Sequence, residues 1–189
     1  MTIGRRSFAL AALGVLIAAL FAVQSATAAG NGAGAQTFTE HTHKETIVEF
    51  DYLPCSDTPI PGRITQSVTG VFHATELTKG KGAGTFWITG TFTGTFLFEP
   101  IDSELVPGPE DTLVPEDPNY EVIPGATTYS GRFTVWFGEN GNLQNHNGTF
   151  TFSIRGVGSD GSRLMLHETA HFLLTPNGVE FEFDKIRCG

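Results

Sequence analysis

The sequence predicts an all-β fold, an antiparallel up-and-down barrel of about seven to eight strands, with a two-sheet β-sandwich as the alternative. Residues 82–98, GAGTFWITGTFTGTFLF, carry the strongest signal, because phenylalanine, isoleucine or glycine alternates there with threonine or tryptophan. A period of two over such a run indicates a strand with two unlike faces. Gly90 and Gly94 would allow this long strand to bend. Glycine- and asparagine-containing turns separate the other alternating runs, and no helix is predicted.

Residues 1–28 are expected to form a signal peptide rather than part of the fold. Arg5 and Arg6 precede an apolar run at 8–23, and small residues at 26–28 suit cleavage. The run is too short to be preferred as a membrane anchor. The paired arginines leave a twin-arginine and an ordinary secretory signal both open. The protein is therefore expected to be secreted.

A flexible, glycine- and alanine-rich leader is expected at 29–40, and one β-domain at 41–189. Without the two arginines of the signal, nine of the 11 basic residues remain against 20 acidic ones, a formal charge of −11. This charge argues against nucleic acid and against an anionic membrane as partners. We expect a monomer without a cofactor.

The strands are expected, in order, at 42–52, 63–77, 82–98, 127–137, 149–156, 163–174 and 179–187. In the first strand the alternation places Val48 and Phe50 inward and Glu45, Glu49 and Asp51 outward. In the last strand it places phenylalanines inward and acidic residues outward. The inward set there is Val179, Phe181 and Phe183, and the outward set is Glu180, Glu182 and Asp184.

An acidic, proline-rich loop is expected at 99–126, because residues 99–121 hold no basic residue. Such a composition buries little apolar surface and is typical of a solvated insertion. An acidic lid or a cation-binding flap is the functional alternative, and an eighth strand near Tyr120–Ile123 remains open.

Cys55 and Cys188 are the two cysteines of the chain. In an exported protein they are expected to form a disulfide. The bond would join the end of the first strand to the end of the last, which is where a barrel closes.

His167, Glu168 and His171 form an H-E-x-x-H sequence, the pattern of zinc proteases. Zinc binding requires a helix, which would place the two histidines one turn apart. In a strand they would lie about 13 Å apart. Because strand patterns surround the segment, we expect no metal site and disfavour a metalloprotease. The same strand would direct Glu168 inward, among Leu166, Ala170 and Phe172, so burial makes it the candidate catalytic carboxylate.

The stretch TYSGRFTVWFGENGNLQNHNGTFTFSIRGVGSDGSRLMLHETAHF, followed by FDKIRC, resembles a group of uncharacterised secreted bacterial β-barrel proteins. Pro54–Cys55 and Cys188 stand at matching places, and the resemblance covers residues 52–189. It implies an exported barrel and brings no assigned activity. The architecture alone is also similar to the lipocalin and allene-oxide-cyclase barrels.

Three functions follow from these patterns. The first is binding of a small apolar ligand in an interior where inward glycines leave volume. The second is an isomerase- or cyclase-type reaction with Glu168 as acid or base. The third is adhesion through the outward face that carries Thr residues, Trp87 and Trp136. The residues expected to line the ligand site are Phe72, Phe86, Phe92, Phe96, Phe133, Phe152 and Tyr129.

Overall fold

The computed structural model describes residues 34–109, 112–142, 145–175 and 178–189, with side chains described outside 174–182. The expected signal peptide and the first residues of the expected leader lie outside these ranges.

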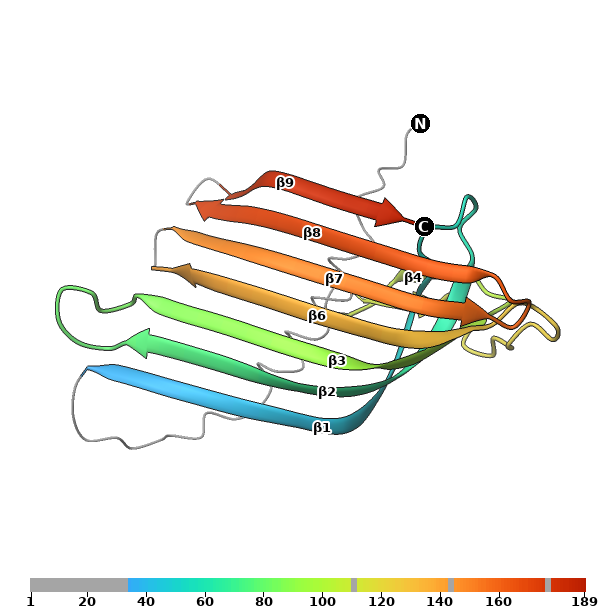
Figure 1. Ribbon diagram of the computed structural model, residues 1–189, viewed down its shortest axis with the longest axis horizontal. Coiled ribbons are helices and arrows are strands. Elements are labelled where there is room, and N and C mark those ends of the chain that lie inside the picture. Colours follow the sequence, from blue (N-terminus) through green and yellow to red (C-terminus); the bar gives the residue numbers. More distant parts are fainter. Residues whose placement is uncertain (1–33, 110–111, 143–144, 176–177) are drawn as a thin grey trace.

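One antiparallel sheet of seven strands forms the body of the protein, in the order β1-β2-β3-β6-β7-β8-β9 (Figure 1). A small hairpin of two strands, β4 and β5, makes a second sheet. None of the described residues lies in an α-helix, and no helix among them is long and apolar enough to cross a membrane. The strands are β1 Ala35–Tyr52, β2 Pro61–Leu77, β3 Phe86–Pro100, β4 Leu105–Pro107, β5 Leu113–Pro115, β6 Tyr129–Gly141, β7 His146–Gly158, β8 Arg163–Thr175 and β9 Gly178–Cys188.

The expected all-β, up-and-down antiparallel order is confirmed, because each strand of the sheet pairs with its neighbours in the chain. The expected closed barrel is wrong. Strands in this order alternate in direction, so with seven of them β1 and β9 run the same way. They cannot close an all-antiparallel ring, which requires an even number. No ladder between described residues joins β1 to β9, so the sheet is open.

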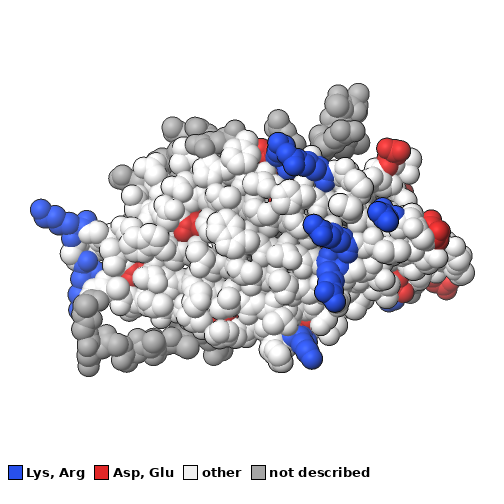
Figure 2. All heavy atoms as spheres, viewed as in Figure 1, with Lys and Arg blue, Asp and Glu red and all other residues white. Residues whose placement is uncertain are grey.

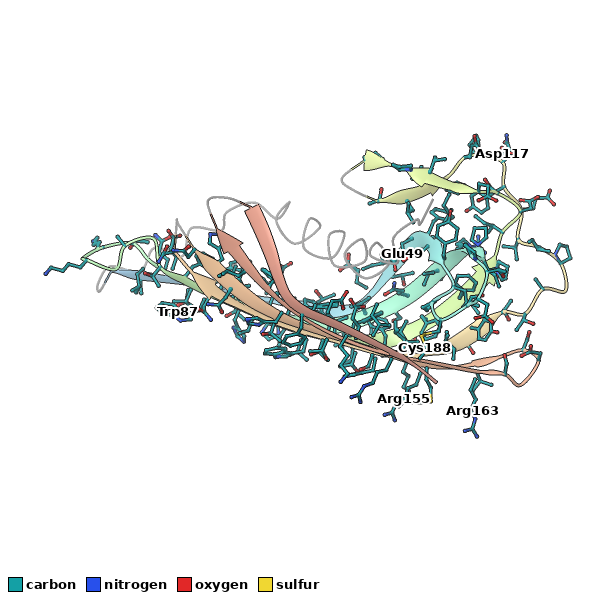
Figure 3. All side chains as sticks on the ribbon, turned by 90° about the horizontal axis from the view of Figure 1, so that it is seen from above. Glu49, Trp87, Asp117, Arg155, Arg163 and Cys188 are labelled. Carbon is teal, nitrogen blue, oxygen red and sulfur yellow. A yellow bond between two sulfur atoms is a disulfide. The ribbon has the colours of Figure 1, made fainter. Side chains whose placement is uncertain are left out.

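The acidic segment supplies no eighth strand to the sheet. It forms the β4–β5 hairpin instead, and a single bridge joins Ile101 to Val122. Ile101, Ser103 and Leu105 are buried while Asp102 and Glu104 are exposed, so the segment alternates and packs rather than being solvated throughout. The hairpin lies on one side of the curved sheet, with Asp117 in its connection to the rest of the chain (Figure 3).

The curvature gives the sheet a concave inner face and a convex outer face. Glu49 lies on the inner side, and Trp87, Arg155 and Arg163 point away from it on the outer side (Figure 3). Apolar residues gather on the inner face and form the core, as expected for an antiparallel sheet with one solvated side. This core contains Val68, Phe72, Phe92, Phe96, Phe98, Phe133, Val135, Phe137, Phe150, Leu164 and Ala170.

Glycines on the inner face are covered by phenylalanine rings from the neighbouring strand. A Cβ at Gly90 would overlap the ring of Phe137, which stands directly opposite it in the register. The expectation that the glycines leave open volume is therefore wrong, since flat rings fill it, as in aromatic rescue of glycine. The same arrangement joins Gly70 to Phe92, Gly94 to Phe133 and Gly148 to Phe172.

The first strand begins at Ala35, inside the expected leader, and a bulge between Thr42 and Glu45 inserts one extra residue. Lys44, at φ 49°, adopts the left-handed conformation there. One extra residue exchanges the two faces of everything that follows. Glu49 and Asp51 consequently face inward and Val48 is 56% exposed, so the faces expected for this strand are wrong.

A second bulge, between His171 and Phe172, has the same effect on β9. Phe183 pairs with His171 on the outer face and is 49% exposed, while Asp184 pairs with Ala170 on the inner face. The faces expected for these two residues are therefore also wrong. The side chains of Val179, Phe181, Glu180 and Glu182 lie outside those described.

The predicted disulfide between Cys55 and Cys188 is confirmed, with Cα atoms 5.6 Å apart. It joins the turn after β1 to the end of β9. These are the two edge strands of the sheet, and no backbone ladder of the described chain joins them. Gly189 N–H, directly after the bridge, donates to the carbonyl of Met165 at 3.2 Å. One end of the open sheet is thereby drawn together.

Replacing Cys55 and Cys188 with serine should lower the free energy of unfolding by about 5 kcal/mol, because the bridge closes a long loop in the unfolded chain. Urea denaturation of the oxidised protein, the reduced protein and the double variant measures this. Equal stability of all three would contradict the assigned role.

Gly90→Ala should destabilise the protein by about 1–3 kcal/mol, since its methyl group would overlap the buried Phe137 ring. The control is Gly138→Ala on the outer face, where a Cβ would lie 3.1 Å from Trp136, whose exposed ring can move into solvent. Thermal unfolding should show a smaller loss for the control. Equal losses of thermal stability in the two variants would mean that the packing of rings over glycines does not stabilise the inner face.

Candidate functional site

The inner face brings most of the expected ligand-site residues into one apolar cluster. Phe72, Phe92, Phe96 and Phe133 are buried within it, on three adjacent strands. Phe152 and Tyr129 are partly buried and pack against the same cluster. The rings of Phe92 and Phe137 stack at 6.2 Å, with an interplanar angle of 9°. These residues form one aromatic cluster, called here the aromatic surface of the inner face.

Phe86 lies apart from this cluster. Its ring meets His146 edge-on at 4.9 Å, near the turn that precedes β3. Tyr129 is fixed at the other end of the face by the hydroxyl of Ser162, which donates to its phenolic oxygen at 3.1 Å. Phe86 is therefore separate from the aromatic surface, and Tyr129 forms part of its border.

Glu168 lies on the inner face of β8, between Phe152 of β7 and Ile186 of β9 in the register. The residue is only 5% exposed. Burial, and next the charge of Asp184, raise the pKa of Glu168 to about 7. A carboxyl with this pKa exchanges a proton at neutral pH, which suits an acid, a base or a hydrogen-bonding group.

Glu49 and Asp51 form a second acidic pair, on β1 in the curved part of the sheet. Burial and the charge of Asp51 raise the pKa of Glu49 to about 7, although a hydrogen bond from the Gln66 side chain lowers it. Burial also raises the pKa of Asp51 to about 7. The backbone N–H of Tyr52 donates to Asp51 Oδ1 at 2.7 Å, and this hydrogen bond lowers the same pKa by a smaller amount. At neutral pH both carboxyls are partly protonated.

The alternation in β1 hides this pair, since the bulge at 42–45 reverses the faces. Ile47 gives the one sequence signal, because this aliphatic residue shares its side with Glu45, Glu49 and Asp51. An aliphatic side chain on the acidic side contradicts a simple inward–outward assignment.

Glu40 adds another carboxylate to the inner face, opposite Phe72 in the register. Its Oε2 is buried and accepts no hydrogen bond from any described residue. A buried acceptor without a partner costs about 1–3 kcal/mol. No lysine or arginine among the described strand residues has its place on the inner face. The face combines aromatic surface with hydrogen-bond acceptors.

The H-E-x-x-H sequence lies in an extended strand, as the sequence indicated. His167 and His171 are on the outer face, where their Nδ1 atoms meet Ser153 Oγ at 2.8 Å and Thr149 Oγ1 at 2.9 Å. Glu168 is on the opposite face, so the three side chains do not converge. Over the residues that the structure describes, no group of three potential ligands could hold a metal ion.

No protein-family model, curated protein or solved structure matches the chain.

The raised pKa values predict how stability depends on pH. Ordinary carboxyls in the unfolded chain titrate near pH 4, so between about pH 4 and 7 the folded state binds more protons at Glu49, Asp51 and Glu168 than the unfolded state. These groups therefore lower the free energy of unfolding as pH rises through that range, and the effect levels off above pH 7.

Glu49→Gln with Asp51→Asn should remove part of this fall, so the variant gains stability relative to the parent as pH rises. The control is Glu116→Gln, an exposed acidic residue, which should follow the parent. Urea denaturation at intervals from pH 4.5 to 8.5 gives the comparison. A difference that is constant across the range would show that the two carboxyls do not titrate as described.

Proposed function

We propose that the protein binds a small apolar ligand on its inner face, and that the ligand carries a hydrogen-bond donor such as an amine. The observation that supports this most is the cluster of phenylalanine side chains on adjacent strands, bordered by carboxyl groups and by no lysine or arginine of the described strands. Apolar surface with a few placed polar groups is the usual composition of a small-molecule site.

The carboxyl groups define the polar end of the ligand. Glu168 and Glu40 are buried acceptors beside Phe152 and Phe72 respectively. A ligand N–H would satisfy such an acceptor, and a cationic amine would favour its ionised form. An acidic ligand would be repelled. A neutral or basic apolar molecule therefore fits this face better than a fatty acid does.

We place this function outside the cell. The disulfide between Cys55 and Cys188 is compatible with an oxidising compartment, where such bonds persist. The expected signal sequence agrees with the same location.

Glu168 also supports a second candidate, an isomerase- or cyclase-type enzyme. Its pKa of about 7 lies near physiological pH, which is the condition for efficient general acid–base catalysis. In such a reaction Glu168 would move a proton on a substrate held by the phenylalanine surface. Replacing Glu168 with Gln would then abolish turnover and leave substrate binding intact.

A titration with the neutral fluorophore Nile red tests the binding proposal. Fluorescence should saturate at roughly one fluorophore per protein, as for a single small-molecule site. Dodecylamine should displace the dye at lower concentration than dodecanoate, because the face carries acceptors. Glu168→Gln should bring the displacing concentrations of dodecylamine and dodecanoate closer together. Phe152→Ala should weaken dye binding.

Trp136→Ala, on the outer face, is the matched aromatic control and should bind the dye like the parent. Non-saturating fluorescence, or loss of dye binding in the Trp136 variant, would contradict an inner-face site. Stronger displacement by dodecanoate would contradict the assigned ligand chemistry.

A further inference from the structure

The outer face has a charge opposite to that of the whole protein. The chain has a formal net charge of −9, yet the outer positions of β6, β7 and β8 carry no acid. The register of β9 places one acid on this face, Glu180 opposite Leu173, ten residues along β8 from Arg163. Figure 2 shows this face as mostly uncharged and crossed by a band of basic side chains. The basic residues on these strands are Arg132, Arg155, Arg163, Lys185 and Arg187, all exposed.

Arg132 and Arg155 stand directly opposite each other on β6 and β7. Like charges in this position destabilise a sheet. Neither arginine takes part in the ion pairs between described residues, whereas Arg63, on β2, is paired with Glu99 at 2.8 Å. Two adjacent guanidinium groups without a carboxylate form a site for an oxyanion, which each can bind in a bidentate manner.

Trp136 lies on the same face, four residues along β6 from Arg132, and is 42% exposed. Its ring carbons Cη2 and Cζ2 lie 3.1 and 3.2 Å from where a Cβ at Gly138 would stand. The indole therefore lies down along the strand, over a residue without a side chain. A flat, half-exposed indole offers its face to a planar or ring-shaped ligand.

Hydroxyl groups fill the positions between the arginines and the tryptophan. Thr134 of β6 stands opposite Ser153 of β7, at the position between Arg132 and Trp136. Thr151 of β7 stands opposite Trp136. On β3 the neighbouring positions are Thr91, Thr93 and Thr95. Each hydroxyl both donates and accepts a hydrogen bond. Such an array matches a ligand that itself carries many hydroxyl groups.

We propose that the outer face of β6–β9, with the adjacent Thr row of β3, binds an anionic polysaccharide. The carboxylate or sulfate groups of the sugar chain lie on Arg132 and Arg155, a sugar ring stacks on Trp136, and the threonine row meets the sugar hydroxyls. This surface is independent of the inner-face ligand.

A polysaccharide fits better than a membrane or a nucleic acid. The basic band is narrow, and a single sugar chain can follow it without meeting the acidic remainder of the protein. A bilayer or a duplex presents a wider anionic surface, which the net negative charge of the whole protein would repel. Trp136 also lies along the sheet instead of projecting, so it is poorly placed to enter a lipid interface.

Affinity electrophoresis of the full chain with polygalacturonate and dextran sulfate tests the proposal, with neutral dextran as the uncharged sugar control. Retardation by the two anionic polymers should weaken with added salt, because the contacts are charged. Arg132→Gln with Arg155→Gln should weaken binding about tenfold or more. The matched control is Lys79→Gln with Lys81→Gln, which removes the same charge in the turn before β3 and should bind like the parent.

Trp136→Ala should weaken binding of the polysaccharides about fivefold, since stacking contributes beyond charge. Its exposed position allows folding to be retained, which thermal unfolding verifies. Equal losses in the arginine and lysine variants, an unchanged Trp136 variant, or no binding of either anionic polymer would overturn the proposal. Phosphatidylglycerol vesicles and duplex DNA are tested in parallel, and tighter binding of either than of the sugars would also overturn it.

Discussion

The bond between Cys55 and Cys188 is the constraint on which the shape of this protein depends, because the hydrogen bonds leave its two edge strands apart. Seven alternating strands place β1 and β9 in the same direction, so no antiparallel ladder could join them, and within the described residues no ladder of either kind joins these two edge strands. A covalent link at one end brings the edges together there and lets the other end stay open (Figure 3). The disulfide therefore fixes how far apart the two edge strands stand at that end.

Most of the fold could be predicted because the alternation in β2, β3, β6, β7 and β8 follows the pleat without interruption. For that reason the alternation in β8 correctly predicts that Glu168 faces inward. Alternation failed in β1 and β9, where one extra residue at each bulge reverses the faces. Glu49, Asp51 and Asp184 were therefore expected on the wrong side. No local pattern at 42–45 announces the bulge, which becomes visible only in the register of β1 against β2.

Both bulges lie in pairs that include an edge strand, where they also limit association between sheets. An open sheet exposes unpaired backbone groups on β1 and β9, and bulges and charged side chains discourage another strand from pairing there. Lys44 stands in the bulge of β1, and Asp184, Lys185 and Arg187 are exposed along β9. The same irregularities that brought carboxyls onto the inner face thus protect the edges. One local distortion has two consequences.

In a single sheet every strand contributes side chains to both faces, because successive residues point to opposite sides. On the inner face, bulky rings need glycine opposite them, which fixes the spacing of Gly90 and Gly94 in β3. Thr91 and Thr93, which lie between these glycines on the outer face, are free of that packing. The outer face can therefore carry costly features such as the opposed Arg132 and Arg155, because stability is supplied from the other side. The proposed anionic polysaccharide would neutralise this like-charge pair.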